Sequence, residues 1–342
     1  MSEHSPTPAA PTRLSYIQAV QRALRWALES REDTFYLGED VAIPGGPFGA
    51  TKGLYVDFGP ERIFDTPISE TAFLGLALGA AMTGQRPIAE VMYADFMFVA
   101  MDQVVNQIAN VHHSSNGRLT APLVIRTQGG HSPGSCAQHS HSIEAHLAHT
   151  PGLRVAVPST PDDAYQINRS AVESDDPVIV HEARMLYPSK GPVRLDAPVE
   201  SIGGARVVHP LDESLAAGGR AVTVVTWSRM LPESVRAAEQ VAADGIAVEV
   251  VDLRWLSPLD FNTVAESLSR TGRLVVAHEA NLTGGFGAEI AARAAAECWD
   301  RLRAPVARVG LPDLPMPAAP ALQETVVPGS DDVAEAARKV TA

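Results

Sequence analysis

Thr66-Pro67-Ile68-Ser69-Glu70 opens the stretch that decides the fold, and the small apolar run Gly75-Leu76-Ala77-Leu78-Gly79-Ala80-Ala81 follows it. The pattern places one carboxylate at the start of an apolar helix, which we expect over residues 71–83. A carboxylate loses favourable hydration when it is buried without a partner, whereas a helix N-terminus stabilises negative charge. Glu70 is therefore either an ordinary first-turn acid or a functional group that needs a specific partner.

Short apolar strands alternate with helices through the first half of the chain. We expect strands at 34–37, 87–92, 123–126, 154–157 and 178–181, and helices at 71–83, 96–112, 143–149 and 161–173. An earlier amphipathic helix begins at a capping box formed by Ser15 and Gln18. This alternation predicts an α/β fold in which helices cover both faces of a mostly parallel sheet.

The pattern weakens after residue 190 and then starts again. Strands are expected at 221–227, 247–251, 273–278 and 306–309, and helices at 231–243, 260–269, 287–298 and about 331–340. We therefore divide the chain into a disordered tail (1–12), a first domain (13–190), a connector (191–219) and a second domain (220–342). Both domains are expected to be doubly wound α/β units.

Composition narrows the class of protein. The formal net charge is −13 and no Lys/Arg run occurs, which argues against binding to nucleic acid or to an anionic membrane. Only Cys136 and Cys298 are present, as suits a reducing compartment. Met1–Thr12 has no secretory signal pattern, and no apolar run approaches the roughly 20 residues that span a bilayer. A cytoplasmic protein is expected.

Several motifs follow one another in a defined order. They are Gly38-Glu39-Asp40-Val41, Thr66 to Glu70, Arg86-Pro87-Ile88-Ala89-Glu90, Ala94-Asp95-Phe96, Asp102 to Gln107, Ala137 to Ala145, and His149-Thr150-Pro151-Gly152-Leu153. From about Leu14 to Ala336, this set resembles the β subunit of the thiamine-diphosphate-dependent, decarboxylating component of 2-oxo acid dehydrogenase complexes. The resemblance implies a pyrimidine-binding domain followed by a transketolase C-terminal-like domain.

The resemblance also implies roles for individual residues. Glu70 matches the acid that hydrogen-bonds the aminopyrimidine of thiamine diphosphate, Phe96 the aromatic ring that packs against it, and Ile68 and Met92 the neighbours that line the pocket. Burial of Glu70 would raise its pKa and the helix N-terminus would oppose that shift, so its protonation state stays open. Without the motif, Phe96 is an ordinary core residue.

Two further residues match positions that the family assigns to catalysis. His139 matches a histidine proposed as a proton donor in decarboxylation or in acyl transfer to lipoamide, and a structural imidazole is the alternative. The family usually has Ser-Gln-Ser after this histidine, whereas this chain has Ser140-His141-Ser142. Glu39 matches an acid suggested to join a relay of carboxylates, and a helix-cap or solvent role is equally open.

The resemblance extends to a structural monovalent cation, such as potassium, held largely by backbone carbonyls. The matching positions are Leu123, Ala171, Val172, Ser174 and Asp176. Carbonyl ligation leaves almost no trace in a sequence, and relatives commonly differ from Ser174 and Asp176. A potassium ion is therefore expected only by analogy.

One motif of the cofactor site is missing from this chain. Enzymes of this group hold the diphosphate and Mg²⁺ through Gly-Asp-Gly and a later Asn, and no Gly-Asp-Gly occurs here. The resemblance therefore implies an α subunit that completes the site in an α2β2 heterotetramer. It also implies a lipoyl acyltransferase partner, for which the acidic tail with Glu324, Asp331, Asp332 and Glu335 is a candidate contact, although a solvated face is the simpler interpretation.

The expected activity is oxidative decarboxylation of a small-molecule 2-oxo acid, pyruvate or a branched-chain one, with acyl transfer to lipoamide. Alternatives are an acetoin dehydrogenase subunit, a split transketolase-like enzyme that would need basic residues such as Arg126 and Arg184 for phosphate, and a scaffold subunit without activity. Three other patterns are discounted: a transition-metal site of histidines 131–149, a nucleophilic Cys136 in place of a buried thiol, and dinucleotide binding by Gly284-Gly285-Phe286-Gly287.

Overall fold

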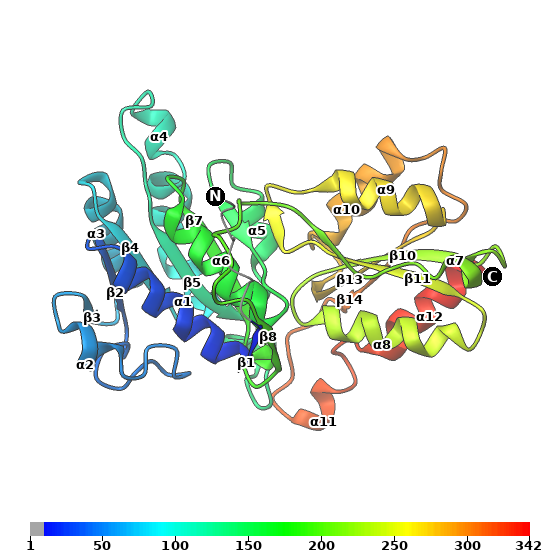
Figure 1. Cartoon of the computed structure of the whole chain (residues 1–342), viewed down its shortest axis with the longest axis horizontal. Coiled ribbons are helices and arrows are strands. Elements are labelled where there is room, and N and C mark those ends of the chain that lie inside the picture. Colours follow the sequence, from blue (N-terminus) through cyan, green and yellow to red (C-terminus); the bar gives the residue numbers. More distant parts are fainter. Residues whose placement is uncertain (1–9) are drawn as a thin grey trace, which may run out of the picture.

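The computed structural model describes residues 10–342 as two α/β domains that lie side by side (Figure 1). The N-terminal domain holds a seven-stranded sheet of order β12-β6-β7-β5-β4-β2-β3, and the C-terminal domain holds a five-stranded sheet of order β14-β13-β10-β11-β9. A third, two-stranded sheet pairs β1 with β8. Most of the predicted tail lies outside the described residues, and Thr12 already begins β1.

The N-terminal domain is built from the following elements. Its strands are β1 (Thr12–Ser15), β2 (Thr34–Gly38), β3 (Ile63–Asp65), β4 (Arg86–Val91), β5 (Val124–Gly129), β6 (Arg154–Ala156), β7 (Val178–Ala183) and β8 (Lys190–Val193). Its helices are α1 (Tyr16–Ser30), α2 (Leu54–Phe58), α3 (Glu70–Met82), α4 (Val111–Ser114), α5 (Glu144–Ala148) and α6 (Pro161–Glu173), with the 3₁₀ helices η1 (Ala94–Ala100), η3 (Ala137–His139) and η4 (Arg184–Leu186) and the π-helix η2 (Asp102–Ile108).

The C-terminal domain repeats the alternation of strands and helices. Its strands are β9 (Arg206–His209), β10 (Ala221–Thr226), β11 (Ala247–Asp252), β13 (Leu274–Asn281) and β14 (Ala307–Leu311), and its helices are α7 (Glu213–Ala216), α8 (Met230–Ala242), α9 (Phe261–Thr271), α10 (Gly287–Glu297), α11 (Pro320–Gln323) and α12 (Ser330–Thr341). The remaining strand, β12 (Trp255–Ser257), leaves this domain and pairs antiparallel with β6 of the N-terminal sheet.

The hydrophobic pattern of the sequence explains most of these elements. Strands β2, β4, β5, β7, β10, β11 and β13 are largely buried, all of them except β2 contain Val or Ile, and they pair in parallel within their sheets. Helix α1 starts at the predicted capping box, where Ser15 accepts from the Gln18 amide and Gln18 from the Ser15 amide. Apart from the segment 96–112, every predicted strand and helix is present, with ends within three residues of the prediction.

The single helix expected over 96–112 is wrong. The segment forms η1, then η2, in which the Ala109 amide reaches back five residues to the Val104 carbonyl, and then α4. The Asn110 side chain donates to the Val105 carbonyl at 2.8 Å, so a side chain takes over a bond that a regular helix would make with its backbone. The short strands β1, β3, β8, β9 and β12 were not predicted, because three or four residues are too few to show a period.

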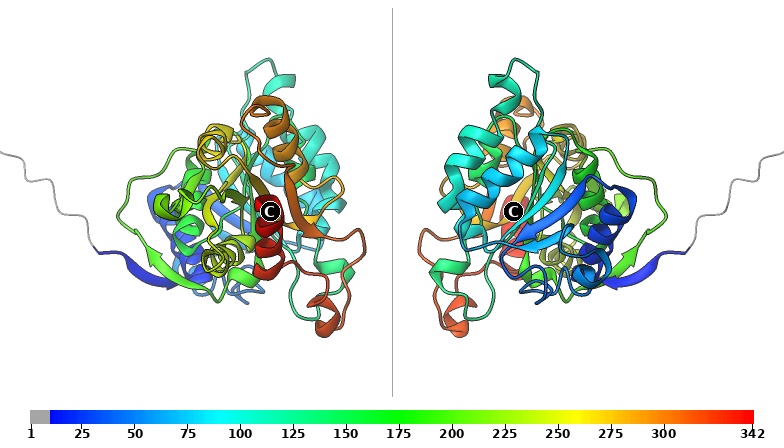
Figure 2. Two further views of the ribbon diagram at one scale, coloured as in Figure 1. Left: turned by 90° about the vertical axis from the view of Figure 1, so that its right-hand side faces the viewer. Right: turned by 90° about the vertical axis from the view of Figure 1, so that its left-hand side faces the viewer.

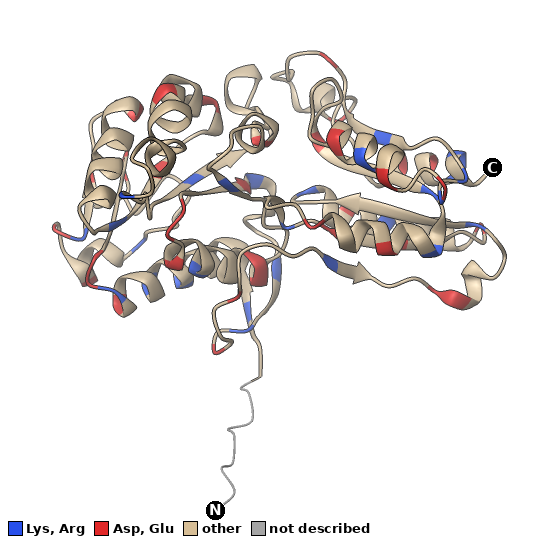
Figure 3. Cartoon of the chain, turned by 90° about the horizontal axis from the view of Figure 1, so that it is seen from above, with Lys and Arg blue, Asp and Glu red and all other residues tan. Residues whose placement is uncertain are grey.

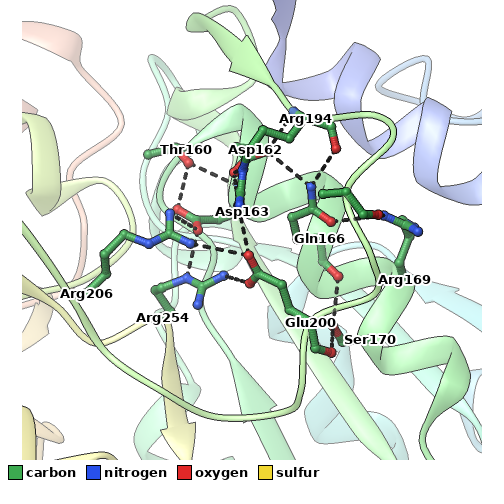
Figure 4. A network of polar contacts seen from close by, with 11 residues as sticks. Thr160, Asp162, Asp163, Gln166, Arg169, Ser170, Arg194, Glu200, Arg206 and Arg254 are labelled. Atoms are coloured by element: carbon green, nitrogen blue, oxygen red, sulfur yellow. Dashed lines mark hydrogen bonds and ion pairs between the residues drawn. The ribbon is translucent and has the colours of Figure 1, made fainter. Parts of the chain in front are cut away.

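The two domains share one buried apolar cluster. It joins Phe73 and Met97 of the N-terminal domain with Trp227, Leu253 and Val264 of the C-terminal domain. A polar network also crosses the boundary, where α6, the connector and the strand end after β11 meet (Figure 4). Strand β9 lies within the segment predicted as a connector and pairs antiparallel with β11.

Lys, Arg, Asp and Glu residues are interspersed along the ribbon of both domains (Figure 3). The segment between β14 and α12, which includes α11, lies beside the loop that follows β5 (Figure 2). Within residues 10–342, no helix has both the length and the apolar character that crossing a bilayer requires.

Candidate functional site

The residues singled out from the sequence follow neighbouring parallel strands. Glu39 follows β2, Glu70 follows β3, Phe96 follows β4 and His139 lies in the loop after β5. Because β3, β2, β4 and β5 are consecutive and parallel in the sheet, their carboxyl ends meet at one edge. That edge is where open α/β sheets usually bind ligands.

Two carboxylates lie close together at this edge. Glu70 is the first residue of α3 and only 6% exposed, and its cap residue Ser69 makes no side-chain bond to the helix. The Thr66 amide donates to the Gly38 carbonyl at 2.8 Å, which joins the ends of β3 and β2. Burial raises the pKa of Glu39, and the charge of the nearby Glu70 raises it further. One carboxylate oxygen of Glu39 is buried without a hydrogen-bond partner among the described residues. These effects favour retention of a proton on Glu39.

The rings of Tyr93 and Phe96 form an aromatic wall beside the His139 ring. The Tyr93 ring meets the His139 ring edge-on at 4.7 Å between centroids, and the Phe96 ring meets it edge-on at 5.6 Å. Phe96 and His139 are both half-buried. The sequence predicted both residues, and the tertiary structure brings them into contact across the ends of β4 and β5.

Arg184 and Phe48 complete this wall. The Arg184 guanidinium lies 4.5 Å from the Tyr93 ring centre and donates to the His139 carbonyl at 2.9 Å. Phe48, from a glycine-rich loop after β2, meets the Tyr93 ring at 5.5 Å. Phe48 and Tyr93 were missed by the sequence interpretation; the only signal was that Tyr93 adjoins Met92 and the Ala94-Asp95-Phe96 motif. These contacts fix the orientation of His139 by packing.

The two other pocket residues are placed differently. Met92 is half-buried directly after β4, in the same segment as Phe96. Ile68 is 83% exposed and projects into solvent just before α3. Exposure of a large apolar side chain beside a buried acid is typical of a surface that another molecule covers.

The loop that carries His139 is fixed along its length. Ser140 Oγ lies 2.6 Å from the Cys136 carbonyl and 2.5 Å from Ser135 Oγ. The His141 amide and Nδ1 both reach Oδ1 of Asp95, at 3.3 and 2.5 Å. The contact between His141 and Asp95 was not foreseen, because the residues are far apart in sequence.

The acceptors of the expected monovalent-cation site already have protein donors. The Leu123 carbonyl accepts from Val178, and the Ala171 carbonyl accepts from Ser174. Arg86 Nη1 donates to the carbonyls of Val172 and Ser174 at 3.1 and 2.7 Å, and the Asp176 carboxylate accepts from Arg154. The Arg86 guanidinium places a positive charge on two of these carbonyls, so the described residues do not favour a potassium ion in this arrangement.

The two basic residues considered for phosphate binding, Arg126 and Arg184, already pair with other groups of the protein. Arg126 is fully buried and forms a fork with Glu182, with Nε and Nη2 at 3.0 and 2.8 Å, while Nη1 contacts Glu90 at 2.8 Å and the Tyr36 hydroxyl at 2.6 Å. Arg184 holds the His139 carbonyl. This arrangement counts against the interpretation as a phosphate-binding transketolase-like site.

The discounted patterns can also be located. Cys136 is half-buried, not buried as expected, and its thiol lies 3.1 Å from Gln138 Oε1. In the part of the chain that the structure describes, no three His, Cys, Asp or Glu side chains converge on a metal position. Gly285 and Gly287 pack directly on the buried His278 ring, where a side chain would collide with it. These glycines therefore have a packing role.

Comparisons with known proteins add to this picture. Residues 12–190 match the family "Transketolase, pyrimidine binding domain", and residues 212–333 match "Transketolase, C-terminal domain". A 2-oxoisovalerate dehydrogenase subunit beta of Bacillus subtilis is 38% identical over 96% of this chain and 98% of its own length. A pyruvate dehydrogenase E1 component subunit beta of Leifsonia xyli is 39% identical, over 97% of each chain.

Two further matches widen the range of relatives. The beta subunit of an acetoin:2,6-dichlorophenolindophenol oxidoreductase of Cupriavidus necator is 38% identical over 96% of this chain and 97% of its own length. A solved split-gene transketolase, described as an inactive beta4 tetramer, superposes with a TM-score of 0.78 at 24% identity, over 96% of this chain and 98% of that chain. The latter match supports the fold alone.

Proposed function

The chain belongs to the family of beta subunits of 2-oxo acid dehydrogenase E1 components, and from this membership we propose that Glu70, Glu39, Phe96 and His139 form its half of a thiamine-diphosphate active site. The observation that carries the proposal is the meeting of the buried Glu70 with Glu39 at the sheet edge where Phe96 contacts His139. A buried acid near a second carboxylate whose pKa is raised is suited to proton transfer, and Phe96 holds the His139 imidazole by an edge-on contact.

The residues at the edge fit one half of the cofactor. Glu70 offers a carboxyl group with little exposure, and Phe96 and Met92 offer a half-buried apolar surface for a flat heterocycle. The whole sequence lacks Gly-Asp-Gly, so this chain does not fit the diphosphate and Mg²⁺ half. We assign those ligands to an α subunit. We leave potassium out of the proposal, because Arg86 occupies two of its carbonyl acceptors.

When bound, thiamine diphosphate would supply an acidic thiazolium carbon for addition to a 2-oxo acid, and its thiazolium ring would serve as the electron sink for loss of carbon dioxide. Glu70 would hold a hydrogen bond to the pyrimidine ring nitrogen, and burial together with the charge of Glu70 raises the pKa of the nearby Glu39. His139, fixed by Tyr93, Phe96 and Arg184, would donate a proton as the acyl group passes to lipoamide.

An exposed apolar helix face supports assembly with another subunit. Helix α3 shows Ala72, Leu76, Gly79 and Thr83 to solvent at spacings of three and four residues, and Leu76 is 49% exposed. Ile68 continues this surface at the start of the helix, beside Glu70. Apolar surface next to an incomplete site favours a partner chain over solvent. We propose an α2β2 assembly that acts in the cytoplasm with a lipoyl acyltransferase.

The test is co-expression with an α subunit, followed by acceptor reduction with pyruvate, 3-methyl-2-oxobutanoate and acetoin, each with and without thiamine diphosphate and Mg²⁺. Cofactor-dependent turnover is expected with at least one substrate. Acetoin belongs in the panel because a relative at 38% identity acts on it by name. An assembled complex that turns over none of the three would contradict the proposal and favour a scaffold.

Glu70→Gln should lower turnover by roughly 10²–10⁴-fold while the subunits still assemble, because an amide cannot supply the proton-transfer function of the carboxyl. Glu61→Gln is the matched control, since Glu61 is an exposed acid before β3, at the other end of that strand. Wild-type turnover in Glu70→Gln would remove Glu70 from the mechanism.

A further inference from the structure

His141 and Asp95 form an imidazole–carboxylate pair next to the candidate site. Asp95 has a side-chain exposure of 7%, and its Oδ1 receives both the His141 amide and Nδ1. Its second oxygen, Oδ2, is buried and has no partner among residues 10–342. The His141 ring is 55% exposed, so the carboxylate is buried and the imidazole is accessible to solvent. Such a carboxylate depends on the few donors that it has.

The pair links the same two segments that form the aromatic wall. Asp95 lies directly before Phe96 and two residues after Tyr93, and both of these rings contact His139. His141 lies two residues after His139. The tripeptide 139–141 therefore runs along segment 93–96, with ring contacts at one end and the His141–Asp95 hydrogen bonds at the other.

Other contacts hold the first two residues of the tripeptide 139–141, so the His141 side chain has one distinct role, which is its hydrogen bond to Asp95. Arg184 donates a hydrogen bond to the His139 carbonyl, and the Ser140 hydroxyl is hydrogen-bonded to the Cys136 carbonyl and to the Ser135 hydroxyl. The backbone bond from His141 to Asp95 is long, at 3.3 Å, whereas the bond from Nδ1 is 2.5 Å. The imidazole is thus the main donor that compensates Asp95, and without it a nearly buried carboxylate would adjoin Phe96 with one weak bond.

We propose that His141 is a positioning residue for His139, acting through Asp95 and the segment that carries Phe96. The inference rests on the proposed role of His139. His141 departs from the glutamine that the family usually has at this position; glutamine can also donate a hydrogen bond to Asp95, but only as a neutral group.

The other groups around His141 are weaker partners. It shares a surface groove of about 460 Å³ with Asn281, Thr283 and Asp313, and the Asp313 carboxylate there already accepts from the Thr283 hydroxyl at 2.5 Å. The Phe98 ring meets the His141 ring edge-on at 6.2 Å and the exposed His146 ring at 5.4 Å. His146 therefore shares the aromatic neighbour of His141 but has no hydrogen bond from its ring among the described residues, which makes it a matched control.

The experiment uses the co-expressed complex with His141→Ala, His141→Gln and His146→Gln. His141→Ala should lower kcat by about tenfold or more with little change in the KM of the 2-oxo acid, because misplacement of a catalytic group acts on turnover. His141→Gln should restore most of kcat, because the glutamine amide can also donate a hydrogen bond to Asp95. His146→Gln should match the wild type in kcat and KM.

Hydrogen exchange of the peptide that covers residues 137–143 provides a readout that does not need turnover. Exchange should be faster in His141→Ala than in the wild type and unchanged in His146→Gln. Unchanged exchange, or unchanged kcat in an active His141→Ala complex, would overturn the inference while the proposed function stands. A wild-type complex that is inactive on every substrate would instead defeat the proposed function, and the exchange data would still decide whether His141 fixes this segment.

Discussion

Glu144 illustrates how a single residue can gain unusual chemistry from burial. Its carboxyl group is 3% exposed, and one oxygen accepts from the Trp227 indole of the other domain at 3.4 Å, while the second oxygen has no partner among the described residues. Burial raises the pKa of Glu144 to about 7 and lowers the pKa of His181, which lines the same small cavity, to about 4. Both groups are therefore largely neutral near pH 6.

Glu144→Gln should change the pH dependence of stability. The folded-state pKa is raised, so the unfolded chain loses its proton above about pH 4.5 whereas the folded chain keeps it until about pH 7. Wild-type stability should fall through this window by up to about 1.4 kcal/mol per pH unit from this group, and the glutamine variant should lack that contribution.

Urea unfolding at pH 5 and pH 8 measures the effect as a difference between the two proteins. The variant should gain stability relative to the wild type as the pH rises. Glu297→Gln, at an exposed position on α10, should show no such gain. A constant difference between wild type and Glu144→Gln at both pH values would contradict the assignment.

At the scale of secondary-structure elements, hydrophobic periodicity and helix-capping residues accounted for most of the correct predictions. Helix α6 begins and ends at the predicted residues because Thr160 caps it, Pro161 opens it and its apolar residues Ala164, Ile167 and Ala171 recur at helical spacing. The single helix predicted over 96–112 was wrong because side-chain bonds to the backbone decide the geometry of that segment. Short strands such as β12 are formed by pairing with a distant strand, and no local pattern encodes that partner.

Gly152→Ala should destabilise the fold more than Gly84→Ala. Both glycines have nearly the same positive φ, +97° and +98°. A Cβ at Gly152 would collide with the Ala109 carbonyl at the end of η2, whereas a Cβ at Gly84 would meet open space. The shared backbone conformation costs roughly 1–2 kcal/mol, and we expect the collision to add about 1–3 kcal/mol. Thermal or urea unfolding of both variants measures the difference, and equal losses would exclude a role for the collision.

At the scale of the whole molecule, arginines hold α6, the connector and the C-terminal domain together (Figure 4). Arg254 donates to Asp163 of α6 at 2.8 Å and to Glu200 of the connector at 2.5 Å, and Arg206 reaches Asp163 at 3.2 Å. Burial, and then the charge of Asp163, raise the pKa of Asp252 to about 8, so that Asp252 is largely protonated near neutral pH. The network thus joins charged groups from both domains.

Arg254→Met should lower the free energy of unfolding by about 3–5 kcal/mol, because Asp163 is 1% exposed and would lose its closer cationic partner. Arg338→Met is the control: Arg338 pairs with Asp244 at the surface, where both side chains are more than 40% exposed, and the loss there should be below about 1 kcal/mol. Urea denaturation compares the two variants, and similar losses would mean that the interdomain network adds no more than a surface pair.

The sequence by itself determined the α/β class, the positions of the long helices and buried strands, and the family, because hydrophobic period and motif order are local properties. The sequence also showed that this chain lacks the Gly-Asp-Gly motif expected for diphosphate binding. The tertiary structure decided which of these residues meet. Glu39 with Glu70, Phe96 with His139, and Asp95 with His141 come together only because parallel strands place their carboxyl ends at one edge of the sheet. Contacts between segments that far apart depend on strand order and packing, which no local pattern of residues specifies.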